Sequence, residues 1–155
     1  MLTRYIVSAI IVNNESVLLG QKAQGRPPYP NAWHLPGGGV EDSVLAEKCI
    51  LAGDFENSYF HEELRREVRE EVGIEIKDIA CIVPTYRATV REAETLNKDG
   101  LPTHYYFLEY LCQPAPGTPK AGDDLVSLRW FSKKELATIS LTPPSQEMYH
   151  ELGWL

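Results

Sequence analysis

Cysteine is scarce in this sequence of 155 residues, with three copies at Cys49, Cys81 and Cys112. Their number is odd and no two of them lie close together, which argues against a disulfide framework, a zinc knuckle and a redox-active Cys-X-X-Cys motif. We therefore expect three buried, reduced thiols.

Long apolar runs are also missing. The longest, residues 5–12, is interrupted by Ser8 and is far shorter than the roughly 20 residues that a membrane-spanning helix needs. The polar residues 13–15 follow it where a signal peptide would carry a small-residue cleavage site. The sequence thus predicts a cytoplasmic protein without a membrane segment.

Basic side chains are outnumbered, with 15 against 22 acidic ones and a formal net charge of −7. This balance provides no general basic surface for gripping the phosphates of duplex nucleic acid. A small phosphorylated substrate stays open if a cation bridges it. The length and the 43% of hydrophobic residues suit one compact domain over residues 1–155, burying roughly 70% of its unfolded surface.

Turn-forming residues and apolar patterns divide the chain into alternating kinds of element. We expect strands over residues 5–12, 16–21, 74–91, 104–113 and 125–131, the first two forming a hairpin. Helices are expected over residues 44–52 and from 57–58 to 72, with short ones after Ser132 and within 146–155. Residues 23–39, rich in proline and glycine, and the polar residues around 97–100 are expected to form loops. The mixture predicts an α/β or α+β fold, a sheet sandwiched between helices.

The second predicted helix carries two stripes. The apolar stripe should pack against the sheet, and it consists of Phe60, Leu64, Val68 and Val72. The acidic stripe consists of Glu63, Glu67, Glu70 and Glu71. Like charges three or four residues apart cost a helix roughly 0.2–0.5 kcal/mol per pair, so something should compensate them.

Two explanations of the acidic stripe stay open. Arg66 stands four residues from both Glu62 and Glu70, which suits a solvated helix with salt bridges. Carboxylates in such a cluster also suit a hard cation such as Mg²⁺, which accepts phosphate oxygens as further ligands. The upstream segment 33–41, with its three consecutive glycines, favours the second explanation. Glycines permit unusual backbone angles and close approach, so that a main-chain carbonyl could face the same cation.

Together these segments resemble the signature of the Nudix hydrolase family. The family motif Arg-Glu-apolar-X-Glu-Glu-X-Gly-apolar matches Arg66–Ile74 position by position, and Pro36-Gly37-Gly38 resembles its beginning. The resemblance implies a mixed β-sheet between helices and hydrolysis of a diphosphate linkage. It covers most of the chain, including the late Arg129-Trp130-Phe131 strand.

The chain departs from the family pattern at one point. The family places a glutamate six residues after the signature glycine, where this chain has Val44. Glu41 and Arg66 are 25 positions apart where the motif has 11, so about 14 residues, at about 43–57, are inserted. If the helix register is kept, Ser58 takes the place of the missing glutamate, although Glu56 could reach back into it. The insert, including residues 44–52, is either surface loop growth or a lid or dimer contact.

The resemblance also implies roles for individual residues. Glu67, Glu70 and Glu71 would bind Mg²⁺ or Mn²⁺ with a carbonyl of Gly37 or Gly38, and Arg66 would orient a carboxylate. A carboxylate would take the proton of the attacking water, with Glu70 and Glu67 placed ahead of the loop acids. Those loop acids are Asp123 and Asp124.

Substrate contacts are less closely defined by the sequence. His34 would face the site, unless it is a structural histidine, while Lys22 and Arg26 would touch phosphate. Aromatic residues could stack on a base or belong to the core, namely Tyr29, Tyr86 and Tyr105. We expect a pyrophosphohydrolase of a nucleoside polyphosphate, or of a nucleoside diphosphate linked to another moiety. A non-nucleoside diphosphate, or a nucleotide sensor without catalysis, is the alternative, and a homodimer is possible.

Overall fold

The computed structural model describes residues 2–23, 29, 31–82, 91–123 and 125–155. Three residues named above, Arg26, Tyr86 and Asp124, lie outside these ranges. Eight strands in the described part join into one mixed sheet: β1 (Leu2–Asn13), β2 (Ser16–Lys22), β3 (Trp33–His34), β4 (Gly37–Gly39), β5 (Ile76–Cys81), β6 (Arg91–Leu96), β7 (Pro102–Pro114) and β8 (Leu125–Ser132).

Strand β1 organises the sheet. It runs parallel to β7 from Leu2 opposite Thr103 to Ile11 opposite Cys112, and every other strand pairing is antiparallel in the described chain. Its edge away from β7 pairs with the glycine strand β4, and it continues into β2 through a tight turn at residues 14–15. Strand β1 is therefore common to both halves of the sheet.

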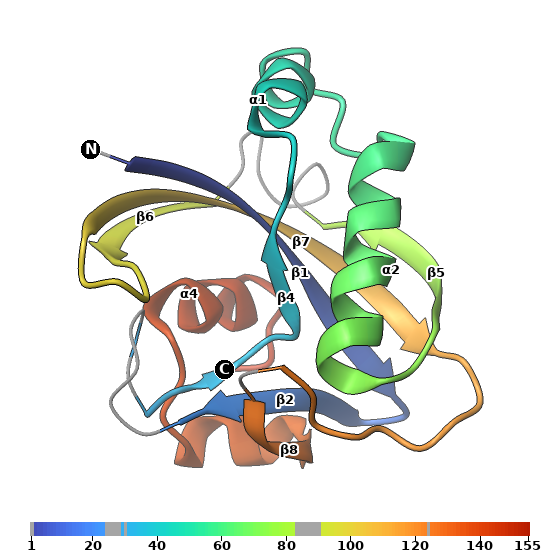
Figure 1. Ribbon diagram of the computed structural model, residues 1–155. Helices are drawn as coiled ribbons and strands as arrows, with labels where there is room; N and C mark the ends of the chain where they lie inside the picture. The colour runs from blue at the N-terminus through green and yellow to red at the C-terminus, as the bar shows by residue number, and fades with distance from the viewer. Residues whose placement is uncertain (1, 24–28, 30, 83–90, 124) are drawn as a thin grey trace.

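Helices cover both faces of the sheet (Figure 1). Helices α1 (Ser43–Leu51) and α2 (Ser58–Val72) pack against β1, β5 and β7, α1 through Ala46 and Cys49 and α2 through its apolar stripe. The 3₁₀ helix η1 (Lys133–Thr138) and helix α4 (Pro143–Glu151) enclose a second core with β1, β2 and β8. The predicted fold, a mixed sheet sandwiched between helices, is confirmed.

Several element boundaries differ from the predictions. Residues 23–39, expected as a loop, contain β3 and β4, and β6 ends directly before the expected loop at 97–100. Of the long strand expected over 74–91, the described residues form β5, and α4 begins at Pro143 rather than within 146–155. Of the three missed strands, β4 and β6 have sequences poor in strand-forming residues and depend on pairing with β1 and β7.

Two further findings concern the absences noted in the sequence. All three cysteines are free and buried, as expected. Within the described ranges, no helix has the length and apolar character required to cross a bilayer.

Candidate functional site

Helix α2 is fixed at both ends by local signals. The Asn57 side chain caps its first turn by accepting a hydrogen bond from the Tyr59 backbone N–H at 2.9 Å. Gly73 ends the helix in the left-handed conformation, with φ of 71°. The predicted apolar stripe is fully buried, with Phe60, Leu64, Val68 and Val72 each at 0% exposure. This packing fixes the rotation of the helix and so decides where the acidic stripe faces.

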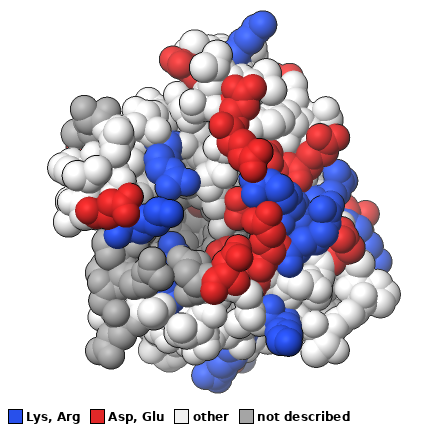
Figure 2. Space-filling model, viewed as in Figure 1, with Lys and Arg blue, Asp and Glu red and all other residues white. Residues whose placement is uncertain are grey.

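The acidic stripe lies along the edge of α2 that faces β4. Figure 2 shows it as a band of red side chains over this helix. Glu63 and Glu71 are each only 7% exposed. The Glu67 side chain is 12% exposed and the Glu70 side chain 46%. Four carboxylates therefore share one side of a helix, and three of them are largely shielded from water.

Strand β4 lies directly beside these carboxylates. The Gly37 N–H donates a hydrogen bond to Glu71 Oε1 at 2.7 Å. A side chain at position 38 would collide with the carboxylate of Glu67. Glycines permit unusual backbone angles, but none of residues 37–39 has a positive φ. Their value is the close approach alone: β4 can lie against both β1 and the Glu67 carboxylate.

Arg66 connects the acids to one another. Its Nε donates to Glu63 Oε2 at 2.8 Å, and its Nη1 lies 3.1 Å from Glu67 Oε1 and 3.3 Å from Glu70 Oε2. Of the two predicted ion pairs, the one with Glu70 forms, while Glu63 takes the place expected for Glu62. One guanidinium therefore bridges three carboxylates.

The acids differ in electrostatic balance. Burial raises the pKa of Glu67; Arg66 lowers it, but the neighbouring Glu70 and Asp123 charges raise it further, and the pKa lies above its usual value. Burial would also raise the pKa of Glu63. There, hydrogen bonds from Arg66, the Glu41 N–H and Tyr59 outweigh burial and hold the pKa below its usual value. The surroundings of Glu63 thus favour its ionised form, whereas those of Glu67 disfavour it.

The donor chemistry of this face suits a hard divalent cation. Carboxylate and carbonyl oxygens are the groups that Mg²⁺ and Mn²⁺ prefer, and Mg²⁺ keeps several waters rather than requiring a full protein cage. The described residues contain no group of three or more His, Cys, Asp or Glu side chains gathered around one point. Glu70 contacts Arg66 and Glu71 contacts Gly37, so the carboxylates do not converge on one point. These residues provide the type of oxygen ligand that a divalent cation needs, but they do not form a closed ligand shell.

A cavity of about 150 Å³ is lined by the three glycines of β4 and by Glu71 of the acidic stripe. His34 and Lys22, both predicted to contact substrate, line it together with Tyr29 and Tyr105. Its other lining residues, not assigned a role from the sequence, include Arg4, Lys98, Phe107 and Glu109. Alternate residues of a strand point to the same face, so residues 4, 6 and 8 of β1 share a face with residues 105, 107 and 109 of β7, which stand opposite them. This alternation was the signal in the sequence that could have found them. Only the parallel register brings the two sets together.

Neither residue proposed for the missing signature glutamate fills its place. Ser58 is exposed at the start of α2. Glu56 turns away, contacting His61 Nε2 at 2.8 Å and accepting a hydrogen bond from the Cys81 N–H. Glu56 therefore does not reach the place of the missing glutamate, because its carboxylate is bound by His61 and by the Cys81 N–H of β5.

Comparisons with known proteins place the chain in a family. The family model described as "NUDIX domain" matches residues 55–152, and the chain belongs to this family. It is a Nudix-type hydrolase, as the signature over Arg66–Ile74 predicted.

Named relatives cover nearly the whole chain. It is 28% identical over 156 residues to the nucleoside triphosphatase NudI of Enterobacter sp. (strain 638), with 100% of both chains covered. It is 30% identical to the NudI of Salmonella schwarzengrund, covering 91% of this chain and 90% of the relative.

Solved structures share the fold. A MutT NUDIX hydrolase from Burkholderia pseudomallei has a TM-score of 0.67 at 21% identity, covering 97% of this chain and 98% of that one. The NUDIX domain of Shewanella oneidensis NrtR, solved in complex with ADP ribose, has a TM-score of 0.67 at 13% identity, covering 98% and 87%.

Proposed function

We propose that this chain is a metal-dependent pyrophosphohydrolase that cleaves a diphosphate linkage in a nucleoside polyphosphate. A nucleoside diphosphate linked to another moiety is the second substrate form within the same proposal. The observation that carries it is the position of the Glu67 carboxylate. It lies against Gly38 of β4, and Gly38 also lines the cavity together with Glu71 of the acidic stripe.

The acidic face would hold Mg²⁺ or Mn²⁺. Glu67, Glu70 and Glu71 would supply carboxylate oxygens, and Gly37 or Gly38 a carbonyl oxygen. When bound, the cation supplies charge neutralisation for a diphosphate and lowers the pKa of a water. Arg66 keeps Glu67 and Glu70 in place through its Nη1 contacts.

Proton removal from the attacking water falls to a carboxylate of the same face. Glu70 is the first choice because its side chain is 46% exposed and can reach solvent. Glu67, whose pKa is raised by burial, is the second. Asp123 comes after both, although its charge is close enough to raise the pKa of Glu67.

The cavity would hold the remainder of the substrate. Its lining includes three cations, Arg4, Lys22 and Lys98, and the stacked rings of Tyr105 and Phe107, whose centroids are 5.7 Å apart. Figure 2 shows basic side chains across a hollow from the acidic band of α2. Cations suit phosphate oxygens and flat rings suit a base. The relatives named nucleoside triphosphatase support nucleoside triphosphates as the first substrates to test.

A substrate panel tests the proposal. Purified protein with Mg²⁺ is incubated with ribo- and deoxynucleoside triphosphates, ADP-ribose, nucleotide sugars and a non-nucleoside diphosphate, and ³¹P NMR identifies the phosphates released. We expect turnover of a nucleotide, its loss with EDTA, and a fall of at least about 100-fold in Glu70→Gln. Glu62→Gln, which removes a charge from the exposed side of the same helix, is the matched control. Undiminished turnover in Glu70→Gln contradicts the role given to Glu70.

The same panel decides the alternatives. If only the non-nucleoside diphosphate is hydrolysed, the substrate class is non-nucleoside diphosphates. If ADP-ribose binds and no compound is hydrolysed, the protein is a sensor. The NUDIX domain of NrtR, crystallised with ADP ribose, makes the second outcome worth measuring.

Other predictions from the sequence are carried into this proposal. They are the single domain over residues 1–155, the insert at about 43–57, the cytoplasmic location and the possible homodimer. Helix α1 in the insert buries Ala46 and Cys49 but leaves Val44 77% and Leu51 80% exposed. Light scattering of Val44→Ser and Leu51→Ser variants measures whether this surface joins two copies.

A further inference from the structure

We propose that Glu63, a residue outside the matched motif Arg66–Ile74, positions Arg66 and through it the carboxylates of Glu67 and Glu70. In this chain Ser58 stands where the family has a glutamate. Glu63 would thereby supply the support for the site carboxylates that the missing glutamate cannot give. It would also connect the insert to the site. The proposal rests on the proposed function insofar as Glu67 and Glu70 bind a divalent cation.

Both carboxylate oxygens of Glu63 are engaged. Oε1 accepts hydrogen bonds from the Glu41 N–H at 2.8 Å and from Tyr59 Oη at 3.0 Å, and Oε2 accepts from Arg66 Nε at 2.8 Å. The Glu63 side chain is 9% exposed. A buried carboxylate held by three donors from three residues has one orientation. Glu63 is therefore a fixed anchor and not a mobile surface charge.

Arg66 transmits this anchoring to the acids. With Nε held by Glu63, the planar guanidinium has its orientation set, and Nη1 then lies 3.1 Å from Glu67 Oε1 and 3.3 Å from Glu70 Oε2. Without Glu63, Arg66 would be free to pair with Glu67 or Glu70 alone. Groups that orient metal-binding side chains in this way commonly change metal affinity by about 10–100-fold.

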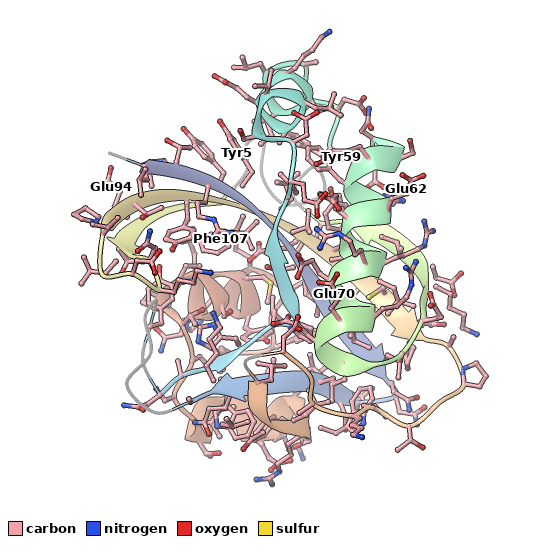
Figure 3. All side chains as sticks on the ribbon, in the orientation of Figure 1. Tyr5, Tyr59, Glu62, Glu70, Glu94 and Phe107 are labelled. Carbon is pink, nitrogen blue, oxygen red and sulfur yellow. The ribbon has the colours of Figure 1, made fainter. Side chains whose placement is uncertain are left out.

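The anchor extends into the insert. Tyr59 Oη, which donates to Glu63, also accepts a hydrogen bond from the Asp42 N–H at 2.8 Å. Asp42 in turn caps α1, accepting from the Leu45 N–H at 3.0 Å. A continuous set of hydrogen bonds thus runs from the first turn of α1 to Arg66. In Figure 3, Tyr59 and Glu70 lie on the side of α2 that faces β4, and Glu62 points the other way.

Mn²⁺ binding tests the proposal without depending on turnover. Dissociation constants are measured by electron paramagnetic resonance for wild type, Glu63→Gln, Tyr59→Phe and the control Glu62→Gln, with circular dichroism melts to verify folding. We expect about 10–100-fold weaker binding in Glu63→Gln, a smaller loss in Tyr59→Phe, and a value within twofold of wild type in Glu62→Gln.

A double-mutant cycle separates positioning from a general loss of structure. Because Glu63 is argued to act through Arg66, Glu63→Gln should have little further effect on Mn²⁺ affinity in an Arg66→Gln background. Equal losses in both backgrounds overturn the proposal, as does Glu63→Gln that is folded and binds Mn²⁺ like wild type.

Turnover on the substrate panel is measured in parallel. Nucleotide hydrolysis in wild type and Glu63→Gln alike, at every Mn²⁺ concentration, overturns the role of Glu63 and leaves the proposed function standing. If Mn²⁺ binding weakens in Glu63→Gln but wild type hydrolyses no panel compound, the proposed function is overturned and the role of Glu63 stands. Absence of Mn²⁺ binding in wild type overturns both.

Discussion

The two halves of helix α2 use the same residue type in opposite ways. In the first half, Glu63 is buried with three donors on its carboxylate, and its pKa lies below the usual value. In the second half, Glu67 is similarly shielded, yet it shares one guanidinium with Glu70 and has a raised pKa. Burial raises the pKa of both residues; three donors reverse the shift at Glu63, whereas at Glu67 the charges of Glu70 and Asp123 oppose the lowering by Arg66.

Under the proposed function, this difference distinguishes the structural carboxylate of Glu63 from the metal-binding carboxylate of Glu67. A carboxylate that the fold already satisfies has nothing to gain from a cation. One that the fold buries without enough donors is destabilised when ionised, and a bound divalent cation removes that cost. Under the proposed function, a bound cation would therefore stabilise the second half of α2 more than the first half.

Glu67→Gln should give the largest effect on Mn²⁺ binding, because it removes a carboxylate that we propose binds the cation directly. We expect Mn²⁺ affinity to fall at least about 100-fold, more than for any residue that only orients a ligand. Isothermal titration of the folded variant measures this. Affinity unchanged from wild type would place the cation elsewhere and end the comparison between the halves.

Gly38→Ala should come next, since the added methyl group displaces the Glu67 carboxylate. A loss of about 10–100-fold in Mn²⁺ affinity is expected with the fold retained. Gly39→Ala is the control, because there the methyl group meets the flexible end of the Arg4 side chain. If both variants bind equally well, the contact between β4 and Glu67 is not what shapes the site.

Glu63→Gln should destabilise the metal-free protein by about 1–3 kcal/mol at pH 7, as expected for losing charged hydrogen bonds. The pKa of Glu63 is lower in the folded state than in the unfolded state. Its contribution is therefore complete above the unfolded pKa of about 4.3 and is lost as the pH falls through the folded pKa. Urea unfolding of wild type and variant at pH 7 and at low pH should show the difference shrinking. If the difference in free energy of unfolding is the same at both pH values, the charge of Glu63 is not what stabilises the fold.

The smallest predicted effect is a gain in the stability of the metal-free protein. In EDTA, Glu67→Gln should raise the free energy of unfolding by about 0.5 kcal/mol at pH 7, because it removes a repulsion with Glu70. The pKa of Glu67 is higher in the folded state, so ionisation destabilises the fold as the pH rises through that value. The gain should disappear when the wild-type carboxyl becomes protonated at lower pH. Destabilisation at neutral pH would show that Arg66 compensates Glu67 fully.

Local signals explain what the sequence could predict. Helix α2 begins after Asn57 and ends at Gly73 as expected, because a cap and a left-handed glycine act within one turn. The intact second half of the Nudix signature likewise lies within nine consecutive residues, Arg66–Ile74, and identified the family.

What the sequence could not predict depends on distant partners. The role of Glu63 requires the Glu41 N–H, 22 residues away, and the insert hides that relation. The cavity residue Arg4 meets Tyr105 only through the β1–β7 register. The strand β6, with the sequence REAETL, has weak strand preference and exists by pairing with β7.

The parallel pairing of β1 with β7 also constrains how this molecule folds. Cys112 Sγ contacts the carbonyl oxygen of Ile10 at 3.7 Å across 102 residues of sequence. Closing so long a loop is slow, since its entropy is lost before the contacts form. On a ribosome, β1 would emerge early and wait for β7 before its register is set. The glycine strand and the cavity wall, which both depend on β1, should therefore be completed late in folding.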